Sequence, residues 1–370
     1  MNEMNFPHED GPVALFLPTL DGGGAERAFV NLARGMVEIG IDVDLVVGNA
    51  SGPFRAEVPK NVNLIDLKAP RLIRALPGLV RYLKLRSPRR LYSALEEAGL
   101  IALLARSLSG KSLPVIPSIR NRLTEEARLG GMKRRGVIVL ARRFFRQADA
   151  LIAVSDGVAE DAAQVLDLPV DRISVIRNPT IVPEMIARSK LPIDDPWFST
   201  DAPPVVLACG RLSAQKDYKT LIRAFAEVRK TQAVRLLILG EGPMRSQLHE
   251  QISDLSLADD IALPGFDPNP FRYMARCSVF VLSSIFEGSP NVLVQAIACG
   301  AAVVSTDCPS GPNEILHNVE SAELVPVGDF VAMAKAIERL LERQTRERTK
   351  SSMAPYDYLF AARRYLEVAV

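Results

Sequence analysis

Short apolar runs of strand length alternate with helix-length periodic segments, and this alternation restricts the chain to an α/β fold. The runs VALFLPT (13–19), VDLVVG (43–48) and NVNLIDL (61–67) are as short and as apolar as buried strands. Between the first two runs, apolar residues from Ala25 to Met36 recur at helical spacing. Apolar strands separated by helices are typical of a parallel sheet that is covered on both faces.

The alternation occurs twice, on either side of a proline-rich stretch. The first series continues with RLYSAL (90–95), LPVIPSI (113–119), ALIAVS (150–155) and RISVIRN (172–178). The second series comprises VVLACG (205–210), RLLILG (235–240), DIALPG (260–265), VFVLSS (279–284) and AAVVST (301–306). Six prolines lie between positions 179 and 204, and we interpret this stretch as a linker.

These patterns predict two doubly wound, Rossmann-like domains facing a cleft, and the length of 370 residues suits two domains. We place the first domain at 1–180 and the second at 204–354. The amphipathic segment 355–370 is expected to form a C-terminal helix that packs on the first domain. Ligands of such open sheets bind outside the carboxyl ends of the strands, so both domains would contribute loops to the cleft.

Composition excludes several classes of protein. The net charge of +2 identifies no partner, and no apolar run reaches the roughly 18–20 residues of a membrane span. The acidic start, MNEMNFPHED, does not resemble a signal peptide. Scattered cysteines beside apolar runs indicate reduced, buried thiols in a cytosolic protein, and neither they nor the three histidines cluster as zinc ligands do. These residues are Cys209, Cys277, Cys299, Cys308, His8, His249 and His317.

The segment SSIFEGSPNVLVQAIACG (283–300) places a carboxylate, Glu287, in a loop of small residues between a strand and an apolar helix. We expect Ser289 to cap this helix and Pro290 to be its first residue. The N–H groups and dipole of the helix would then suit a diphosphate. Glu287, and Gln295 eight positions later, would hydrogen-bond sugar hydroxyls. The alternative is a well-capped helix with a solvent-facing glutamate.

A second loop, GRLSAQKD (210–217), makes the same kind of strand-to-helix turn. Arg211 and Lys216 flank small and polar residues, and Asp217 is the expected cap of the next helix. An arginine fork and a lysine point charge at the end of a strand suit a phosphate group. The alternative is an exposed turn with ordinary surface charges.

A glycine-rich turn, LDGGGAER (20–27), stands at the equivalent place in the first domain, and its glycines permit positive φ and close approach of a ligand. A plain tight turn is the alternative. Arg27 replaces the third glycine of the dinucleotide fingerprint, which argues against a dehydrogenase, and no G-x-x-x-x-G-K-[ST] element supports ATP hydrolysis. The pair Asp42-x-Asp44 could hold a divalent metal, but we interpret both acids as solvated residues at the start of a strand.

Five segments, in order along the chain, together resemble the retaining glycosyltransferases of family 4, which are two-domain nucleotide-sugar enzymes of the GT-B architecture. The similarity covers most of the chain and is densest from 205 to 330. The segments are DGGGAER (21–27), GRLSAQKDYKTLIRAFA (210–226), LILGEGPMRSQL (237–248), LPGF (263–266) and EGSPNVLVQAIACGAAVVSTDCPSGPNEIL (287–316).

The resemblance implies roles for the matching residues. Glu287 matches the first acid of the family's Glu-x7-Glu element, which contacts the donor sugar. Gln295 stands where the second acid binds the ribose; an amide can still hydrogen-bond a diol, without charge assistance. Arg211 and Lys216 match the pair that grips the donor diphosphate and, with Glu287, are the predicted catalytic residues. The predicted donor-binding residues are Gly23, Gly24, Gly210, Phe266, Gly288, Ser289, Pro290, Asn291, Val292 and Gln295.

On the acceptor side the chain departs from its relatives. Many of them carry a histidine near the end of a first-domain strand, whereas the comparable stretch here has Arg120 and Asn121. Glu96 and Glu97 follow another strand and would bind acceptor hydroxyls or simply favour a helix N-terminus. The mechanism that the resemblance implies is retention at the anomeric carbon, with no metal, no cofactor and no protein nucleophile, and with cations stabilising the leaving diphosphate.

Charge is unevenly distributed. Between Lys68 and Arg146 there are 19 Lys and Arg against 4 Asp and Glu, a local excess of +15. In the stretches 70–90 and 132–147 these cations are interleaved with aliphatic residues. We interpret both as helices that lie on an anionic membrane, although two solvated helix faces would show the same pattern. Nucleic acid is not expected, because no aromatic stacking platform is evident.

The sequence therefore predicts an enzyme that transfers a hexose or an N-acetylhexosamine from a UDP-sugar to a lipid-linked or lipopolysaccharide glycan. We expect it in the cytoplasm, peripheral on the inner face of the cell membrane. One alternative is a nucleotide-sugar 2-epimerase of the same fold, and another is a non-catalytic nucleotide-sugar-binding module.

Overall fold

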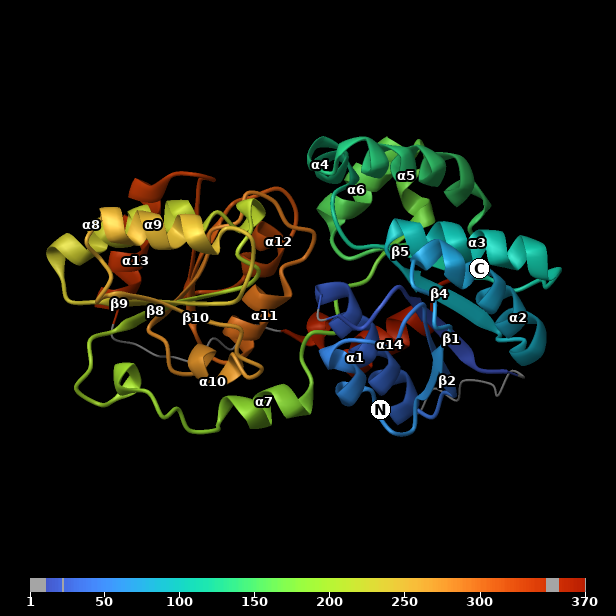
Figure 1. Cartoon of the computed structure of the whole chain (residues 1–370), viewed down its shortest axis with the longest axis horizontal. Coiled ribbons are helices and arrows are strands. Elements are labelled where there is room, and N and C mark those ends of the chain that lie inside the picture. The colour runs from blue at the N-terminus through green and yellow to red at the C-terminus, as the bar shows by residue number, and fades with distance from the viewer. Residues whose placement is uncertain (1–10, 22, 344–352, 370) are drawn as a thin grey trace. The chain divides into compact units, whose positions relative to one another are not determined.

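Strands and helices alternate along most of the computed structural model, and the predicted strands appear in the expected order, whereas β13 (Ala322–Val325) was not predicted (Figure 1). The structure describes residues 11–21, 23–343 and 353–369. It divides the chain into two units, of which the second is Thr180–Tyr356 and the first comprises the chain before and after it. The expectations for the N-terminal ten residues, for Gly22 and for 344–352 lie outside the described residues.

The first unit contains a seven-stranded parallel sheet of order β3-β2-β1-β4-β5-β6-β7. The strands are β1 (Val13–Leu17), β2 (Val43–Val47), β3 (Asn63–Asp66), β4 (Arg90–Ala94), β5 (Val115–Ile119), β6 (Leu151–Ala153) and β7 (Ile173–Val175). The helices are α1 (Gly24–Glu38), α2 (Leu76–Arg86), α3 (Glu96–Ser109), α4 (Leu123–Leu129), α5 (Gly131–Phe144), α6 (Asp156–Leu166) and α14 (Tyr358–Leu366). Short 3-10 turns include η2 (Leu72–Ala75) and η3 (Phe145–Gln147).

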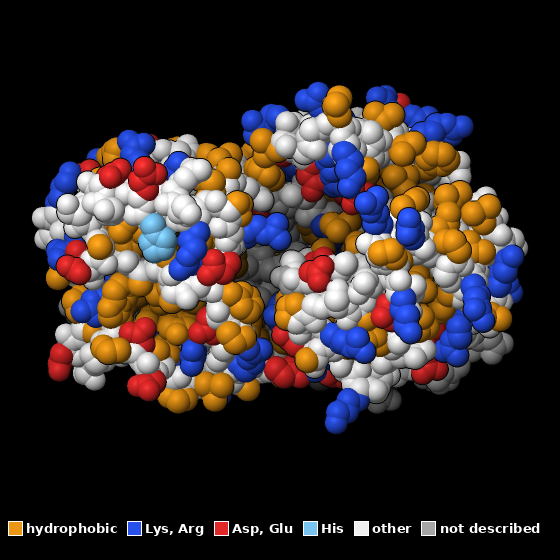
Figure 2. All heavy atoms as spheres, in the orientation of Figure 1, with side chains coloured by type: hydrophobic (Ala, Val, Ile, Leu, Met, Phe, Trp, Pro, Cys, Tyr) orange, Lys and Arg blue, Asp and Glu red, His pale blue; other side chains and the backbone are white. Residues whose placement is uncertain are grey.

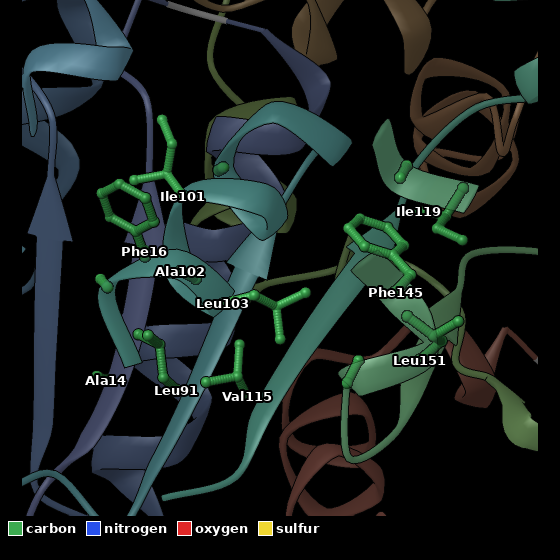
Figure 3. Close-up of a cluster of buried hydrophobic side chains, with 14 of the residues drawn as sticks. Ala14, Phe16, Leu91, Ile101, Ala102, Leu103, Val115, Ile119, Phe145 and Leu151 are labelled. Atoms are coloured by element: carbon green, nitrogen blue, oxygen red, sulfur yellow. The ribbon is translucent and has the colours of Figure 1, made fainter. Parts of the chain in front are cut away.

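Alternate residues of the buried strands serve two separate cores. On β1, Ala14 and Phe16 pack with α2, α3, α5 and α6, whereas Leu15 and its neighbours pack with α1 and α14. Figure 3 shows the first core, where Ile101 and Leu103 of α3 lie beside the strand residues. Because both faces of the central strands are covered, these strands are mostly apolar, which is why period-2 alternation of polar residues is missing from them.

The C-terminal helix α14 packs against α1 of the first unit. Gly35 of α1 permits the contact, since a Cβ atom there would lie 2.5 Å from the carbonyl oxygen of Tyr358. At the other end of the helix, the Tyr92 hydroxyl of β4 donates a hydrogen bond to the carbonyl oxygen of Tyr365 (2.6 Å), and burial raises the pKa of Tyr92 to about 12. The C-terminal segment is therefore part of the first unit's core.

The second unit contains a six-stranded parallel sheet of order β10-β9-β8-β11-β12-β13. The strands are β8 (Val205–Cys209), β9 (Arg235–Leu239), β10 (Ile261–Gly265), β11 (Val279–Leu282), β12 (Ala302–Thr306) and β13 (Ala322–Val325). The helices are α7 (Pro183–Ser189), α8 (Tyr218–Thr231), α9 (Arg245–Asp254), α10 (Phe271–Met274), α11 (Asn291–Ala298), α12 (Pro312–Leu316) and α13 (Phe330–Glu342). One core lies under α8, α9 and α13, and a second lies under α7, α10, α11 and α12.

The interpretation of the proline-rich stretch as a linker was wrong. Met185 of α7 is buried, and Trp197 and Phe198 pack against the same core of the second unit. The side-chain amide of Asn269 also donates to the carbonyl oxygen of Arg188 (3.0 Å). The prolines interrupt a segment that forms no regular sheet. The apolar residues of this segment nevertheless pack on the core of the second unit.

None of the four cysteines forms a disulfide; Cys209 is half-buried and the other three are buried. Burial raises the pKa of the Cys209 and Cys308 thiols to about 12, so both stay protonated at neutral pH. None of the described helices combines the length and the apolar composition that crossing a bilayer requires.

The packing of α14 gives a stability prediction. Tyr365→Ala removes a fully buried ring and is expected to destabilise the first unit by about 3–5 kcal/mol. Phe360→Ala, on the same helix but 43% exposed, is expected to cost less than about 1 kcal/mol. Urea unfolding followed by circular dichroism measures both. Equal losses for the two variants would show that α14 does not contribute to the core.

Candidate functional site

The strand order of the second sheet has a switch point between β8 and β11. From β8 the chain builds outwards through β9 and β10, whereas β11 lies on the other side of β8 and leads to β12 and β13. All these strands are parallel, so the loops that follow β8 and β11 emerge side by side at the carboxyl edge. Open α/β sheets bind their ligands at this position.

Backbone and side-chain hydrogen bonds join these two loops. The Ser283 hydroxyl donates to the carbonyl oxygen of Lys216 (2.7 Å), and the amide of Ile285 donates to the carbonyl oxygen of Gln215 (2.8 Å). The Gln215 side chain donates in return to the carbonyl oxygen of Phe286 (2.9 Å). The loops therefore form one rigid platform. The sequence pattern did not indicate the roles of Ser283 and Gln215.

At the centre of this platform, Lys216 and Glu287 form an ion pair. The lysine Nζ lies 2.6 Å from Glu287 Oε1, and the Ser284 hydroxyl donates to the same oxygen (2.6 Å). Glu287 is only 7% exposed, which contradicts the alternative of a solvent-facing glutamate. Among the described residues nothing donates to Glu287 Oε2, and the ammonium group keeps two further N–H donors.

Arg211 is exposed and forms no ion pair with any described residue. The structure therefore places it on the same loop as Lys216 without bringing its guanidinium into the Lys216–Glu287 pair. The predicted cap of the following helix is confirmed: Asp217, with φ of +45°, accepts a hydrogen bond from the amide of Thr220 (3.3 Å).

Helix α11 begins one residue later than predicted. Its N-cap is Pro290, which has extended backbone (φ −71°, ψ 93°), and Asn291 is the first helical residue. The expectation that Ser289 caps the helix was therefore wrong, because the chain stays extended through the proline. Gln295 lies on the second turn, is 8% exposed, and its side chain makes no hydrogen bond to a described residue.

The remaining predicted donor-side residues lie in loops at the same edge of the second sheet. Gly288, Ser289 and Val292 flank the start of α11. Gly210 follows β8 with φ of +153°, and a Cβ atom there would lie 3.0 Å from the Tyr218 hydroxyl. Phe266 follows β10 and is 66% exposed.

The glycine-rich turn of the first unit precedes α1. Gly23 is the N-cap, with φ of −78°, and Gly24 is the first helical residue, so neither uses the left-handed backbone that we expected glycine to supply. Arg27 forms an ion pair with Glu57 (2.9 Å) and stacks on Phe54. These two contacts give Arg27 a structural role within the first unit.

The predicted acceptor-side residues are engaged within the first unit. Glu96 is 1% exposed and pairs with Arg134 of α5, which also contacts Glu126 and lies 3.9 Å from Glu97. The Arg120 guanidinium donates to the Ser118 hydroxyl (3.2 Å) and to the Tyr365 hydroxyl (3.3 Å), and burial lowers its pKa.

Asn121 is the second residue after β5, next to Arg120, and is half-buried.

The interpretation of Asp44 as solvated was wrong, whereas Asp42 is exposed as expected. Asp44 is 1% exposed and accepts hydrogen bonds from Tyr82 (2.9 Å), Arg86 (3.1 Å) and Asn63 (2.7 Å). It is a structural carboxylate.

The buried pair gives a prediction about stability. Lys216→Met leaves an unpaired buried carboxylate and is expected to destabilise the second unit by about 3–5 kcal/mol, whereas adding Glu287→Gln restores most of this loss. The control is Lys230→Met, which breaks the exposed Lys230–Glu227 pair and should cost less than about 1 kcal/mol. Denaturant unfolding of the three variants checks this. A double variant no more stable than Lys216→Met would contradict it.

Comparison with known proteins identifies the fold and the family. Residues 23–179 match the glycosyl transferase 4-like domain, and residues 203–343 match the glycosyl transferases group 1 domain. Among solved structures, HepE of Anabaena covers 96% of this chain and 98% of its own, with a TM-score of 0.76 and 20% identity. Sucrose-phosphate synthase from Thermosynechococcus elongatus covers 96% of this chain and 94% of its own, with a TM-score of 0.72 and 20% identity.

Two curated relatives match over more than four fifths of the chain. LpsE of Rhizobium meliloti, a lipopolysaccharide core biosynthesis glycosyltransferase, is 29% identical over 86% of each chain. The N-acetylgalactosamine-N,N'-diacetylbacillosaminyl-diphospho-undecaprenol 4-alpha-N-acetylgalactosaminyltransferase of Campylobacter jejuni is 30% identical over 89% of this chain and 90% of its own. With two parallel α/β units and both domain models in order, the chain belongs to the GT-B glycosyltransferases that combine a glycosyl transferase 4-like domain with a group 1 domain.

Proposed function

We propose that this glycosyltransferase transfers a hexose or an N-acetylhexosamine from a UDP-sugar to a membrane-linked saccharide in cell-surface glycan synthesis. The observation that carries the proposal is the Lys216–Glu287 pair at the switch point of the second sheet. The relatives support it: one is named for transfer to a diphospho-undecaprenol-linked saccharide, and another for lipopolysaccharide core synthesis. Structures of the neighbour HepE were solved with UDP and with UDP-glucose.

In this proposal the donor diphosphate binds beside Lys216. The ammonium group can donate to a phosphate oxygen while it remains paired with Glu287, because it has three donors. Arg211, on the same loop and without an ion pair among the described residues, adds a second cation that can fork onto the phosphates. The dipole of α11 favours negative charge at the same edge.

Glu287 then positions the sugar. Ser284 and Lys216 both donate to Oε1, which fixes the carboxylate and leaves Oε2 to accept from sugar hydroxyls. A carboxylate already paired with a cation is a poor nucleophile, so we propose retention by attack of the acceptor on the same face, with its proton passing to the leaving diphosphate. Lys216 and Arg211 stabilise the charge that develops on this leaving group, which makes a metal or further cofactor unnecessary.

Gln295 is proposed to hold the ribose. Its side-chain amide can both donate hydrogen bonds to a diol and accept them from it. The amide makes no hydrogen bond to any described residue. The hydrogen bonds are weaker than those of a carboxylate, so donor affinity rests more heavily on the diphosphate contacts. Gly23, Gly24 and Phe266 stay predicted donor contacts.

The acceptor side is proposed to face an anionic membrane on its cytoplasmic side. Exposed apolar residues gather on the helices of the basic region, and Figure 2 shows them over α3 and α5 with Lys and Arg side chains beside them. They are Ile73, Leu85, Leu104, Leu108, Leu129, Met132, Val139, Leu140 and Phe144. Cations flanking exposed aliphatics suit a surface with anionic headgroups and an apolar interior.

The transfer proposal is tested with purified protein, a panel of UDP-sugars and lipid-linked saccharide acceptors. UDP should raise the melting temperature, since a ligand that binds only the native state stabilises it. Lys216→Ala should lower kcat/KM at least about 100-fold by removing charge stabilisation of the leaving group. The control is Lys219→Ala, because Lys219 is an exposed residue of the next helix that contacts Gln247. Its kcat/KM should equal that of the wild type. NMR of the product's anomeric proton reports retention.

Two outcomes would contradict the transfer proposal. One is normal turnover by Lys216→Ala in a folded protein, which would remove the assigned role. The other is binding of UDP-sugars without transfer to any acceptor, which would favour a binding module. Membership of a glycosyltransferase family already favours transfer over interconversion of free nucleotide sugars by a 2-epimerase.

The membrane proposal predicts that the protein floats with anionic vesicles but not with neutral ones in a sucrose gradient. Changing the exposed apolar residues Met132 and Val139 together to Ser should lower the vesicle partition coefficient at least about 100-fold, because each buried aliphatic side chain contributes about 1.5–3 kcal/mol. Leu255→Ser, an exposed apolar residue of the second unit, serves as the control. Equal flotation with neutral and anionic vesicles would refute the electrostatic part.

A further inference from the structure

The first unit contains an open, mainly apolar groove of about 840 Å³, lined by residues of η2, α3 and α5. Its floor includes Leu100 and Leu103 of α3, and its walls include Ile73, Leu104, Leu140 and Phe144. These four wall residues are between 41% and 62% exposed. Aliphatic and aromatic side chains left open to water around a concave surface mark a ligand site.

The groove runs along α3. Near the N-terminal ends of the two helices, Glu97 of α3 lies 3.9 Å from Arg134 of α5. Near their C-terminal ends, Arg106 of α3 donates to the carbonyl oxygen of Gln147 (2.7 Å), which follows α5. The two helices therefore lie side by side and point the same way. The lining residues of α3 extend from Glu97 to Ser107, a distance of about 15 Å at the rise of an α-helix.

One end of the groove is charged and lies towards the carboxyl edge of the first sheet. Helix α3 starts directly after β4, so Glu97 is at that edge, and Lys133 lies in the first turn of α5 beside it. Arg71 lines the groove from the segment that follows β3. Both cations are exposed, and neither forms an ion pair with any described residue. The other end, at Ser107 and Gln147, carries no charged lining residue.

We propose that this groove binds the hydrocarbon chain of a lipid diphosphate, with Arg71 and Lys133 beside the phosphate groups. The charge pattern fits an amphiphile with an anionic head and a long apolar chain, and the orientation delivers the head to the edge where ligands of parallel sheets bind. This inference deepens the proposed function and rests on it, because the lipid would be the carrier of the acceptor saccharide.

Concavity distinguishes this site from general contact with a bilayer. A flat membrane would engage the exposed Leu85, Leu108 and Val139 as readily as the wall residues, yet these three do not line the groove. A chain seated in the groove would instead depend on Leu104 of α3 and Leu140 of α5, which both line it. Leu108, on the same helix as Leu104 and similarly exposed, provides a matched control.

The test measures binding of geranylgeranyl diphosphate by isothermal titration calorimetry, below its micelle concentration and with excess UDP present to occupy the donor site. Dimethylallyl diphosphate, with the same head and a short chain, is the comparison ligand. Wild-type protein should bind the long-chain diphosphate at least about tenfold more tightly than the short-chain one, because burial of methylene groups adds affinity.

Variants locate the site. The double change Leu104→Ser and Leu140→Ser should weaken binding of the long-chain diphosphate about tenfold while leaving the short-chain one unchanged. Lys133→Ala should weaken both ligands several-fold, since it acts on the shared head. Leu108→Ser should change neither. Equal affinities for long and short chains in the wild type, or an equal loss with Leu108→Ser and with the double variant, would overturn the proposal.

The assay needs no turnover, so its failure is separable from failure of the proposed function. If the lipid binds as described but no lipid-linked saccharide is glycosylated, the function is wrong and the groove assignment stands. If lipid-linked saccharides are glycosylated at rates that depend on neither chain length nor the double variant, the groove assignment is wrong and the function stands.

Discussion

The parallel pairing of β8 with β11 is the constraint on which the candidate site depends. It makes two segments that are more than 70 residues apart emerge at one edge, where Ser283, Ile285 and Gln215 lock them together. Only then can Lys216 and Glu287 form a 2.6 Å ion pair in which the two side chains are 16% and 9% exposed. An isolated loop could not hold a lysine and a glutamate this way, because the cost of desolvating both charges must be offset by fixed partners.

Most elements of the fold could be predicted from the sequence because most strands are short, apolar and followed by a periodic helix, whereas the partly buried β13 was missed. Helix caps could be predicted only in part: the cap at Asp217 was predicted correctly, whereas Pro290 stays extended and is the N-cap in place of the expected Ser289. The linker was misassigned because prolines also interrupt a segment that packs, through Met185 and Trp197, on a core. Sequence spacing does not show which of these two situations holds.

Charge pairing was the least predictable part of the site. Nothing in the spacing of Arg134 indicates that it reaches back to Glu96, and the excess of cations in 68–146 overstates the charge available to a partner. Arg86, Arg122 and Arg146 of that region are paired with Asp44, Asp161 and Asp167 respectively. Arg71 and Lys133 form no ion pair among the described residues, and they lie on the same groove. Three-dimensional pairing thus separates structural cations from those available for recognition.

The second unit is inserted between two parts of the first, since the chain leaves at Pro179 and returns at Asp357. The two crossings are adjacent, because the amides of Thr180 and Ile181 both donate to the carbonyl oxygen of Tyr356 (2.9 Å each). During synthesis on a ribosome, the inserted unit can therefore complete its core before the surrounding one. The core of the first unit, although most of its residues are synthesised earlier, stays incomplete until α14 has left the exit tunnel. Until then, Tyr92 and the side of α1 that contacts α14 remain uncovered.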